Sequence, residues 1–276
     1  MAGHAPLSVV DDSLREAVIA IAREAADAIL QVYEHAFDVE HKADASPLTA
    51  ADLAAHRLID QGLRALDPAL PVLSEEGASI PWEVRRQWQR YWLVDPLDGT
   101  REFVKRNGEF TVNIALVEEG VAILGVVLAP VGGVVWHGVH GAGAFRREGG
   151  QQVELRTRAP ATAPLQVAAS RSHLDPRTRD LLQRLGDART VGLGSSLKFC
   201  RIAEGNMDVY PRFGPTSEWD TAAAQCVLEC AGGAVLAPDG RPFRYNQRRT
   251  LLNGDFIALG DPQLPWREWL GPTQAS

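Results

Sequence analysis

Two aspartates, Asp95 and Asp98, lie three residues apart in the segment VDPLDGT, directly after the apolar run YWL. Other acids also stand at the ends of apolar segments: Asp52, Glu75, Glu76, Glu218 and Asp220. A single acid in such a place is most often a helix cap, and Asp95 with Asp98 could be a turn acid followed by a cap. Several carboxylates directed at one point repel one another unless a cation lies between them. The whole set therefore favours a metal site.

The ligands of such a site would all be oxygen atoms, because no cysteine or histidine cluster has zinc spacing. Mg²⁺ prefers oxygen ligands and often shares them with phosphate, which makes phosphoryl chemistry its natural use here. We expect Pro96 to turn the chain out of a strand and the Leu97 carbonyl to join the carboxylates. Gly99 and Thr100 can then begin a helix whose free N–H groups hold a phosphate, and the Thr100 hydroxyl can orient a water.

Basic residues in the C-terminal half could hold a second phosphate. The segment GLGSSLKFC places Ser195 and Lys198 at the start of a predicted helix. The alternative is a glycine turn with a solvated lysine. Arg212, in YPRFG, can grip phosphate with a fork of donors or can be a surface arginine packed on Tyr210. His173, in SRSH, could contact a base or phosphate, or be a loop residue without a role.

Composition limits the class of protein. The 276 residues, 45% of them hydrophobic, can bury a substantial core, and the net charge of -7 argues against polymeric nucleic acid as a partner. Cys200, Cys226 and Cys230 lack CxxC spacing, so we expect reduced core thiols in a reducing compartment. The chain shows neither a signal peptide nor about 18 consecutive apolar residues. We expect a cytoplasmic protein without an integral membrane segment. Peripheral association with the inner membrane, and the choice between monomer and homodimer, stay open.

The secondary-structure elements that must position these residues follow two different patterns along the chain. Helical periodicity predicts one helix in 11–35, with Ser13 and Glu16 as a capping box, and another that starts near Thr49 or Ala50, with Asp52 in or near its first turn. Short strands from about 70 to 147 predict an antiparallel sheet, and strands then alternate with helices from about 160. The expected class is α/β, with an α+β region at 1–160 and an α/β region at 161–276.

Three acidic segments, LSEEG (73–77), WLVDPLDGT (92–100) and EWDTAAAQ (218–225), resemble in order and spacing the motifs of the lithium-sensitive, magnesium-dependent phosphatases related to inositol monophosphatase. Within that superfamily, KADASPLTAAD (42–52) and YPRFGPTSEWDTAA (210–223) are similar to the bacterial CysQ branch, the 3′(2′),5′-bisphosphate nucleotidases. The likeness covers roughly residues 10 to 260. It implies the layered αβαβα sandwich of the superfamily, which agrees with the two patterns of predicted helices and strands.

The resemblance also implies residue roles. Two Mg²⁺ ions would be held by Glu75, Asp95, Asp98, Asp220 and the carbonyl of Leu97. Asp52 would serve a third ion or a water, and Glu76 is the less favoured glutamate of its pair. In two-metal hydrolysis Glu75 and Thr100 would orient the attacking water. The expected substrate-binding residues are Asp98, Gly99, Thr100, His173, Ser195, Lys198, Arg212 and Asp220.

Three hypotheses about function follow from these residues. The leading one is a nucleotidase that removes the 3′-phosphate of adenosine 3′,5′-bisphosphate, giving AMP and phosphate and clearing a by-product of sulfate activation. The second is a phosphatase for inositol or another sugar monophosphate, which needs no second phosphate grip. Lys198 and Arg212 therefore favour the first. The third is a catalytically silent ligand-binding relative, against which the intact set of acids argues. Preference among 3′,5′, 2′,5′ and phosphosulfate substrates stays open.

Overall fold

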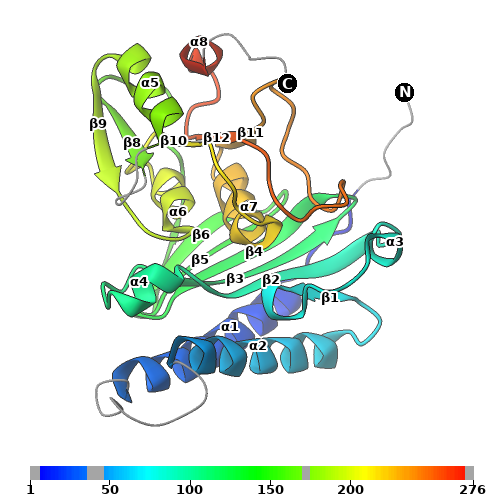
Figure 1. Cartoon of the computed structure of the whole chain (residues 1–276). Coiled ribbons are helices and arrows are strands. Elements are labelled where there is room, and N and C mark those ends of the chain that lie inside the picture. The colour runs from blue at the N-terminus through cyan, green and yellow to red at the C-terminus, as the bar shows by residue number, and fades with distance from the viewer. Residues whose placement is uncertain (1–6, 36–46, 170–174, 271–276) are drawn as a thin grey trace.

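The computed structural model describes residues 7–35, 47–169 and 175–270. Helices and sheets alternate in five layers, in which two mixed sheets separate an outer helix pair, a middle pair and a second outer pair (Figure 1). The expected α/β class and the αβαβα layering are confirmed. His173 lies outside the described residues.

The first sheet has seven strands in sequence order. They are β1 (Val72–Ser74), β2 (Arg90–Asp98), β3 (Thr111–Glu118), β4 (Val121–Ala129), β5 (Val134–Val139), β6 (Gly143–Glu148) and β7 (Gln151–Glu154). The expectation of a wholly antiparallel sheet is wrong at one edge, where β1 runs parallel to β2. The segment between them, which contains helix α3 (Trp82–Arg85), is long enough to return the chain to the same end of the sheet.

Helices α1 (Asp12–His35) and α2 (Pro47–Leu66) cover one face of this sheet (Figure 1). Successive β2 residues alternate between faces, so Trp92 packs with these helices and Leu93 with the middle layer. The predicted capping box at Ser13 is wrong. The Asp11 carboxylate accepts from the Leu14 N–H at 2.7 Å, because the helix begins at Asp12, two residues earlier than a cap at Ser13 requires. Helix α2 also begins earlier than predicted, at Pro47, since proline suits a first helical turn.

The second sheet has the order β11-β12-β10-β8-β9. Its strands are β8 (Leu165–Ala169), β9 (Ala188–Gly192), β10 (Val209–Arg212), β11 (Ala234–Leu236) and β12 (Phe256–Leu259). Helices α5 (Pro176–Leu185) and α8 (Trp266–Leu270) pack on its outer face. The first sheet ends at Glu154 and the second begins at Leu165, on either side of the segment where we expected a boundary.

Helices α6 (Leu197–Ala203) and α7 (Ala222–Cys230) fill the layer between the two sheets (Figure 1). Helix α7 approaches the first sheet closely at two glycines. A Cβ at Gly125 would lie 2.2 Å from the Ala223 carbonyl oxygen, and one at Gly138 would lie 2.9 Å from the Val227 Cα. Glycine is required at both positions, because any side chain would push α7 and the residues before it away from the sheet.

Several short elements escaped the sequence patterns: β7, β12, α3 and α8. The predicted helix at Gly99 and Thr100 is present as α4 (Thr100–Val104), although it has only five residues. Cys200 and Cys226 are buried free thiols as expected, whereas the free Cys230 is only half-buried. No helix in the described part of the chain is long and apolar enough to cross a membrane.

Candidate active site

The parallel pairing of β1 with β2 brings Glu75 next to Asp95. Ser74 and Val94 are paired in register, so the residues that follow them, Glu75 and Asp95, lie side by side at the same end of the two strands. Burial and the charges of Asp98 and Glu76 raise the pKa of Glu75. Burial and the charges of Asp98, Glu75, Asp220 and Asp52 raise the pKa of Asp95 well above its ordinary value. The two carboxyl groups thus share one buried, acidic environment.

A β-bulge explains how Asp95 and Asp98 can serve one site. In a regular strand, residues three apart point to opposite faces. Here Asp95 pairs with Asn113 and Asp98 with Thr111, so β2 contains one residue more than β3 across this stretch. The expectation that the strand ends at Pro96 is wrong, because β2 runs on to Asp98. Proline has no N–H to offer the ladder and is accommodated at a bulge.

Asp98 ties the first sheet to helix α6. Its Oδ2 accepts from the Ser196 N–H at 2.6 Å and from Asn113 Nδ2 at 3.5 Å. The Ser196 hydroxyl donates to Asn113 Oδ1 at 2.8 Å and lies 2.8 Å from the Thr111 hydroxyl. The Ser196 N–H at the start of α6 therefore faces a carboxylate. Burial and Asp220 raise the pKa of Asp98 to about 7, against the lowering effect of Lys198.

Asp220 ends the 3-10 turn η2 (Glu218–Asp220), and Thr221 separates it from α7. Its Oδ2 accepts from the Ser217 N–H at 2.8 Å, and the Ser217 side chain accepts in return from the Asp220 N–H. Burial raises the pKa of Asp220 to about 6, although the Ser217 hydrogen bond lowers it. Asp220 can therefore be both a cap and a member of the site. One of its oxygens caps the turn, and the carboxyl group still lines a pocket.

Asp52 lies on α2 close to Glu75 and Glu76, more than one turn from the start of the helix. Burial, a hydrogen bond with Glu76 and the charges of Glu76 and Glu75 raise its pKa to about 8. Its Oδ1 is enclosed and has no hydrogen-bond partner. A buried carboxylate oxygen without a donor is costly, so this atom fits a site that receives a cation or a water.

The donor set as a whole fits a hard divalent cation such as Mg²⁺. It consists of carboxylates and a carbonyl, and these are the oxygen ligands that Mg²⁺ prefers. In the described ranges, no three His, Cys, Asp or Glu side chains converge on one point at ligand distance. Repulsion between crowded carboxylates favours this separation, and the raised pKa values of Glu75, Asp95, Asp98 and Asp220 report that repulsion together with their burial.

A pocket of about 180 Å³ opens in front of the acids. Six residues expected from the sequence line it: Asp98, Gly99, Ser195, Lys198, Arg212 and Asp220. Glu75, Asp95, Leu97 and Asp52 are not in its lining, and Thr100 is exposed at the start of α4. Arg101, Glu102 and Thr216 also line the pocket, although their sequence context did not single them out.

Lys198 and Arg212 give this pocket positive charge beside the carboxylates. Lys198 is only 7% exposed, so the alternative of a solvated lysine is wrong. Its Nζ donates to the Ser195 carbonyl at 2.8 Å and lies 5.2 Å from the centre of the Tyr210 ring, and burial lowers its pKa to about 8. Arg212 donates from Nη2 to the Pro215 carbonyl at 3.1 Å, while its buried Nε has no hydrogen-bond partner.

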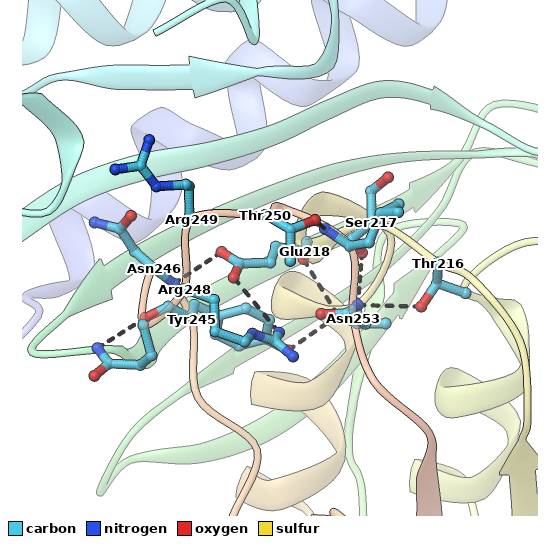
Figure 2. A network of polar contacts seen from close by, with 12 residues as sticks. Thr216, Ser217, Glu218, Tyr245, Asn246, Arg248, Arg249, Thr250 and Asn253 are labelled. Atoms are coloured by element: carbon cyan, nitrogen blue, oxygen red, sulfur yellow. Dashed lines mark hydrogen bonds and ion pairs between the residues drawn. The ribbon is translucent and has the colours of Figure 1, made fainter. Parts of the chain in front are cut away.

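A buried polar network supports the turn that carries Asp220 (Figure 2). Glu218 is fully buried there, and its Oε2 accepts from the Asn246 N–H at 2.8 Å. Glu218 supports the turn from the protein interior, whereas Asp220 lines the pocket. Asn253 carried no sequence signal at all, because its partners are more than thirty residues away.

Comparison with known proteins adds an independent line of observation. The sequence model that describes the inositol monophosphatase family matches residues 11–264 of this chain. The chain is 54% identical over 241 residues to the 3′(2′),5′-bisphosphate nucleotidase CysQ of Escherichia coli strain K12, covering 87% of this chain and 96% of that one. It is 36% identical to the protein of the same name from Haemophilus influenzae, covering 94% and 97% of the two chains. The crystal structure of CysQ from Bacteroides thetaiotaomicron matches with a TM-score of 0.80 and 42% identity, covering 90% of this chain and 97% of that one.

Proposed function

Because the chain belongs to the inositol monophosphatase family, we propose that it hydrolyses the 3′-phosphate of adenosine 3′,5′-bisphosphate to give AMP and phosphate. The observation that carries this proposal is the 54% identity to a 3′(2′),5′-bisphosphate nucleotidase across 96% of that protein. The enzyme is a phosphoric monoester hydrolase, and its natural place is the removal of a nucleotide by-product of sulfate activation.

The family consists of metal-dependent phosphatases, generally dependent on Mg²⁺. In our proposal two ions are held by Glu75, Asp95, Asp98, Asp220 and the Leu97 carbonyl, with Asp52 available to a third ion or a water. When bound, Mg²⁺ supplies the positive charge that acidifies water and offsets the charge of the phosphoryl group and the leaving oxygen. The crowded acids are a suitable host, because a bound cation would relieve their mutual repulsion.

The remaining steps belong to the chain itself. Glu75, whose pKa is raised by burial and by neighbouring acids, orients the attacking water together with the Thr100 hydroxyl and accepts its proton. Asp98 holds its orientation through the Ser196 N–H. No covalent phosphoenzyme is required, since water attacks the phosphorus directly.

Lys198 and Arg212 bind the phosphate that does not react. Both line the pocket that Asp98 and Asp220 also line, so a substrate with two phosphates can present one to the acids and the other to the cations. Arg212 lines the pocket, and a guanidinium there can offer a fork of donors to phosphate oxygens. An inositol monophosphate has no second phosphate to meet this pair.

The test is a phosphate-release panel at saturating Mg²⁺. We expect the highest kcat/KM with adenosine bisphosphates, and much lower values with inositol 1-phosphate and AMP. A preference for inositol 1-phosphate would favour the hypothesis of an inositol phosphatase. The absence of turnover on every substrate would favour a ligand-binding protein without catalytic activity. Arg212→Ala should raise KM for adenosine 3′,5′-bisphosphate, and Arg189→Ala, at an exposed arginine on β9, is its control.

A further inference from the structure

Residues 245–253 form a connecting segment, here called the strap, that runs along the turn carrying Asp220 (Figure 2). Ser217 and Leu252 form an isolated antiparallel bridge. The Glu218 N–H donates to the Leu251 carbonyl at 2.9 Å, and the Asn253 N–H donates to the Thr216 carbonyl at 2.7 Å. The strap therefore pairs with the chain immediately before Asp220.

The Asn253 side chain extends this pairing to both sides of Asp220. Its Nδ2 lies 2.7 Å from the Ser217 carbonyl oxygen, 3.1 Å from the Thr216 hydroxyl and 3.1 Å from the Thr221 hydroxyl (Figure 2). The side chain is buried, with an exposed fraction of 8%. One amide group thus connects the residues before η2 with the first residue after it.

These partners are the ones that set the direction of the Asp220 carboxylate. Ser217, whose carbonyl is held by Asn253, donates its N–H to Asp220 Oδ2 at 2.8 Å. Thr216 and Thr221 line the same pocket as Asp220. A shift of the turn would therefore move the carboxylate and the pocket wall together.

The other end of the strap is anchored independently. The Asn246 side chain exchanges two hydrogen bonds of 2.6 Å with Arg85, one from Arg85 Nη1 and one to the Arg85 carbonyl. Arg85 is 2% exposed and also donates to the Arg248 carbonyl at 3.0 Å. The buried Glu218 side chain accepts from the Asn246 N–H. The strap is thus hydrogen-bonded to α3 as well as to η2.

We propose that Asn253 is a positioning residue for Asp220, holding the turn from Thr216 to Thr221 so that the carboxylate meets Mg²⁺. This inference rests on the proposed function for the identity of the ion. Groups that orient metal ligands typically change metal affinity by about 10- to 100-fold when they are removed. The Asn253 side chain does not line the pocket, and its effect reaches the chemistry through the turn that carries Asp220.

The experiment measures Mg²⁺ binding to the substrate-free protein by isothermal titration calorimetry, together with the Mg²⁺ dependence of kcat. We expect Asn253→Ala to weaken Mg²⁺ binding roughly tenfold and to raise the Mg²⁺ concentration for half-maximal activity by the same factor. KM for adenosine 3′,5′-bisphosphate at saturating Mg²⁺ should change much less. Asn253→Ser, which keeps a hydroxyl donor, should weaken binding by less and decides the question if the alanine variant does not fold.

Two controls separate positioning from general loss of stability. Leu252→Ala changes an exposed side chain of the strap whose contact with Ser217 is through the backbone. Ile29→Val loosens a fully buried position on α1, far from the turn. Both should bind Mg²⁺ like the wild type.

The outcomes distinguish this inference from the proposed function. A folded Asn253→Ala protein with wild-type Mg²⁺ affinity, or equal weakening in Ile29→Val, would overturn the positioning role while leaving the proposed function intact. If the Ala variant does not fold, wild-type affinity in Asn253→Ser overturns it. Wild-type protein that binds Mg²⁺ but hydrolyses no bisphosphate would overturn the proposed function alone. Wild-type protein that binds no Mg²⁺ would overturn both.

Discussion

Replacement of Asp98 by asparagine should stabilise the metal-free protein at alkaline pH while it removes catalysis. Burial and repulsion from Asp220 raise the pKa of Asp98 from 3.8 to about 7 in the folded protein. The folded state therefore binds a proton more tightly than the unfolded state does. Ionisation costs nothing below pH 3.8, and its cost grows as the pH rises and is complete above about pH 7.

The structure sets the size of this effect. The interval between 3.8 and about 7, at 1.36 kcal/mol per pKa unit, corresponds to about 4 kcal/mol. Neighbouring carboxyls share the protons, so we expect about half of that, ~2 kcal/mol, from one substitution. An asparagine oxygen can still accept from the Ser196 N–H, which preserves the contact with α6.

The assay is urea unfolding in EDTA at about pH 4 and about pH 8, for the wild type, Asp98→Asn and the control Asp180→Asn at an exposed position on α5. Asp98→Asn should exceed the wild type by ~2 kcal/mol at the higher pH and match it at the lower. Saturating Mg²⁺ should stabilise the wild type more than the variant. An Asp98→Asn protein that is less stable than wild type at pH 8, or a difference that is the same at both pH values, would refute the electrostatic reasoning.

Further predictions concern single side chains and ions. Asp95→Asn should retain less than about a tenth of wild-type kcat at saturating Mg²⁺, a loss above about 1.4 kcal/mol; steady-state rates that stay higher would contradict its assignment as a ligand. Lys198→Ala and Arg212→Ala should each raise KM for adenosine 3′,5′-bisphosphate by a factor that corresponds to about 1.5–3 kcal/mol of binding free energy. The kinetics with inositol 1-phosphate should stay nearly unchanged. Equal losses on both substrates would favour the hypothesis of an inositol phosphatase. His137 is buried without hydrogen-bond partners, and burial lowers its pKa from 6.5 to about 4. The free energy of unfolding should therefore decrease by about 3 kcal/mol as the pH falls from 6.5 to about 4, because the folded protein disfavours protonation of His137. His137→Phe should reduce this decrease in denaturation curves. If the decrease is unchanged in the variant, His137 is not its source. LiCl should inhibit uncompetitively toward the nucleotide, and more strongly than NaCl at equal ionic strength, because Li⁺ is close to Mg²⁺ in size with half the charge; inhibition matched by KCl would count against this.

Local patterns were enough to predict much of the fold. Helical periodicity located α1 and α2, and short apolar runs located most strands of both sheets. The same patterns missed the edge strand β7, whose residues are all exposed, because an exposed strand has no apolar alternation to reveal it. They also misplaced the start of α1, since two acceptors, Asp11 and Ser13, stand close together and only the folded chain selects one.

For the site, the acids and cations could be named from residue type and neighbours alone. Clustered carboxylates, a glycine before a helix and a lysine in a glycine-rich segment are local signals of chemistry, and Asp98, Asp220, Lys198 and Arg212 do line one pocket. A side chain's chemistry depends on its own atoms, so the sequence is sufficient to propose which groups could bind a metal or a phosphate.

Tertiary structure decided how these groups face one another. The parallel pairing of β1 and β2 places Glu75 beside Asp95, and a one-residue bulge turns Asp95 and Asp98 to the same side. Two hydrogen bonds of the site also join residues far apart in the chain. Ser196 donates to Asp98, and Asn253 donates to the Ser217 carbonyl in the turn that carries Asp220. Such contacts depend on strand register and on the packing of one layer against another, and these are set by the free energy of the whole fold rather than by any local run of residues.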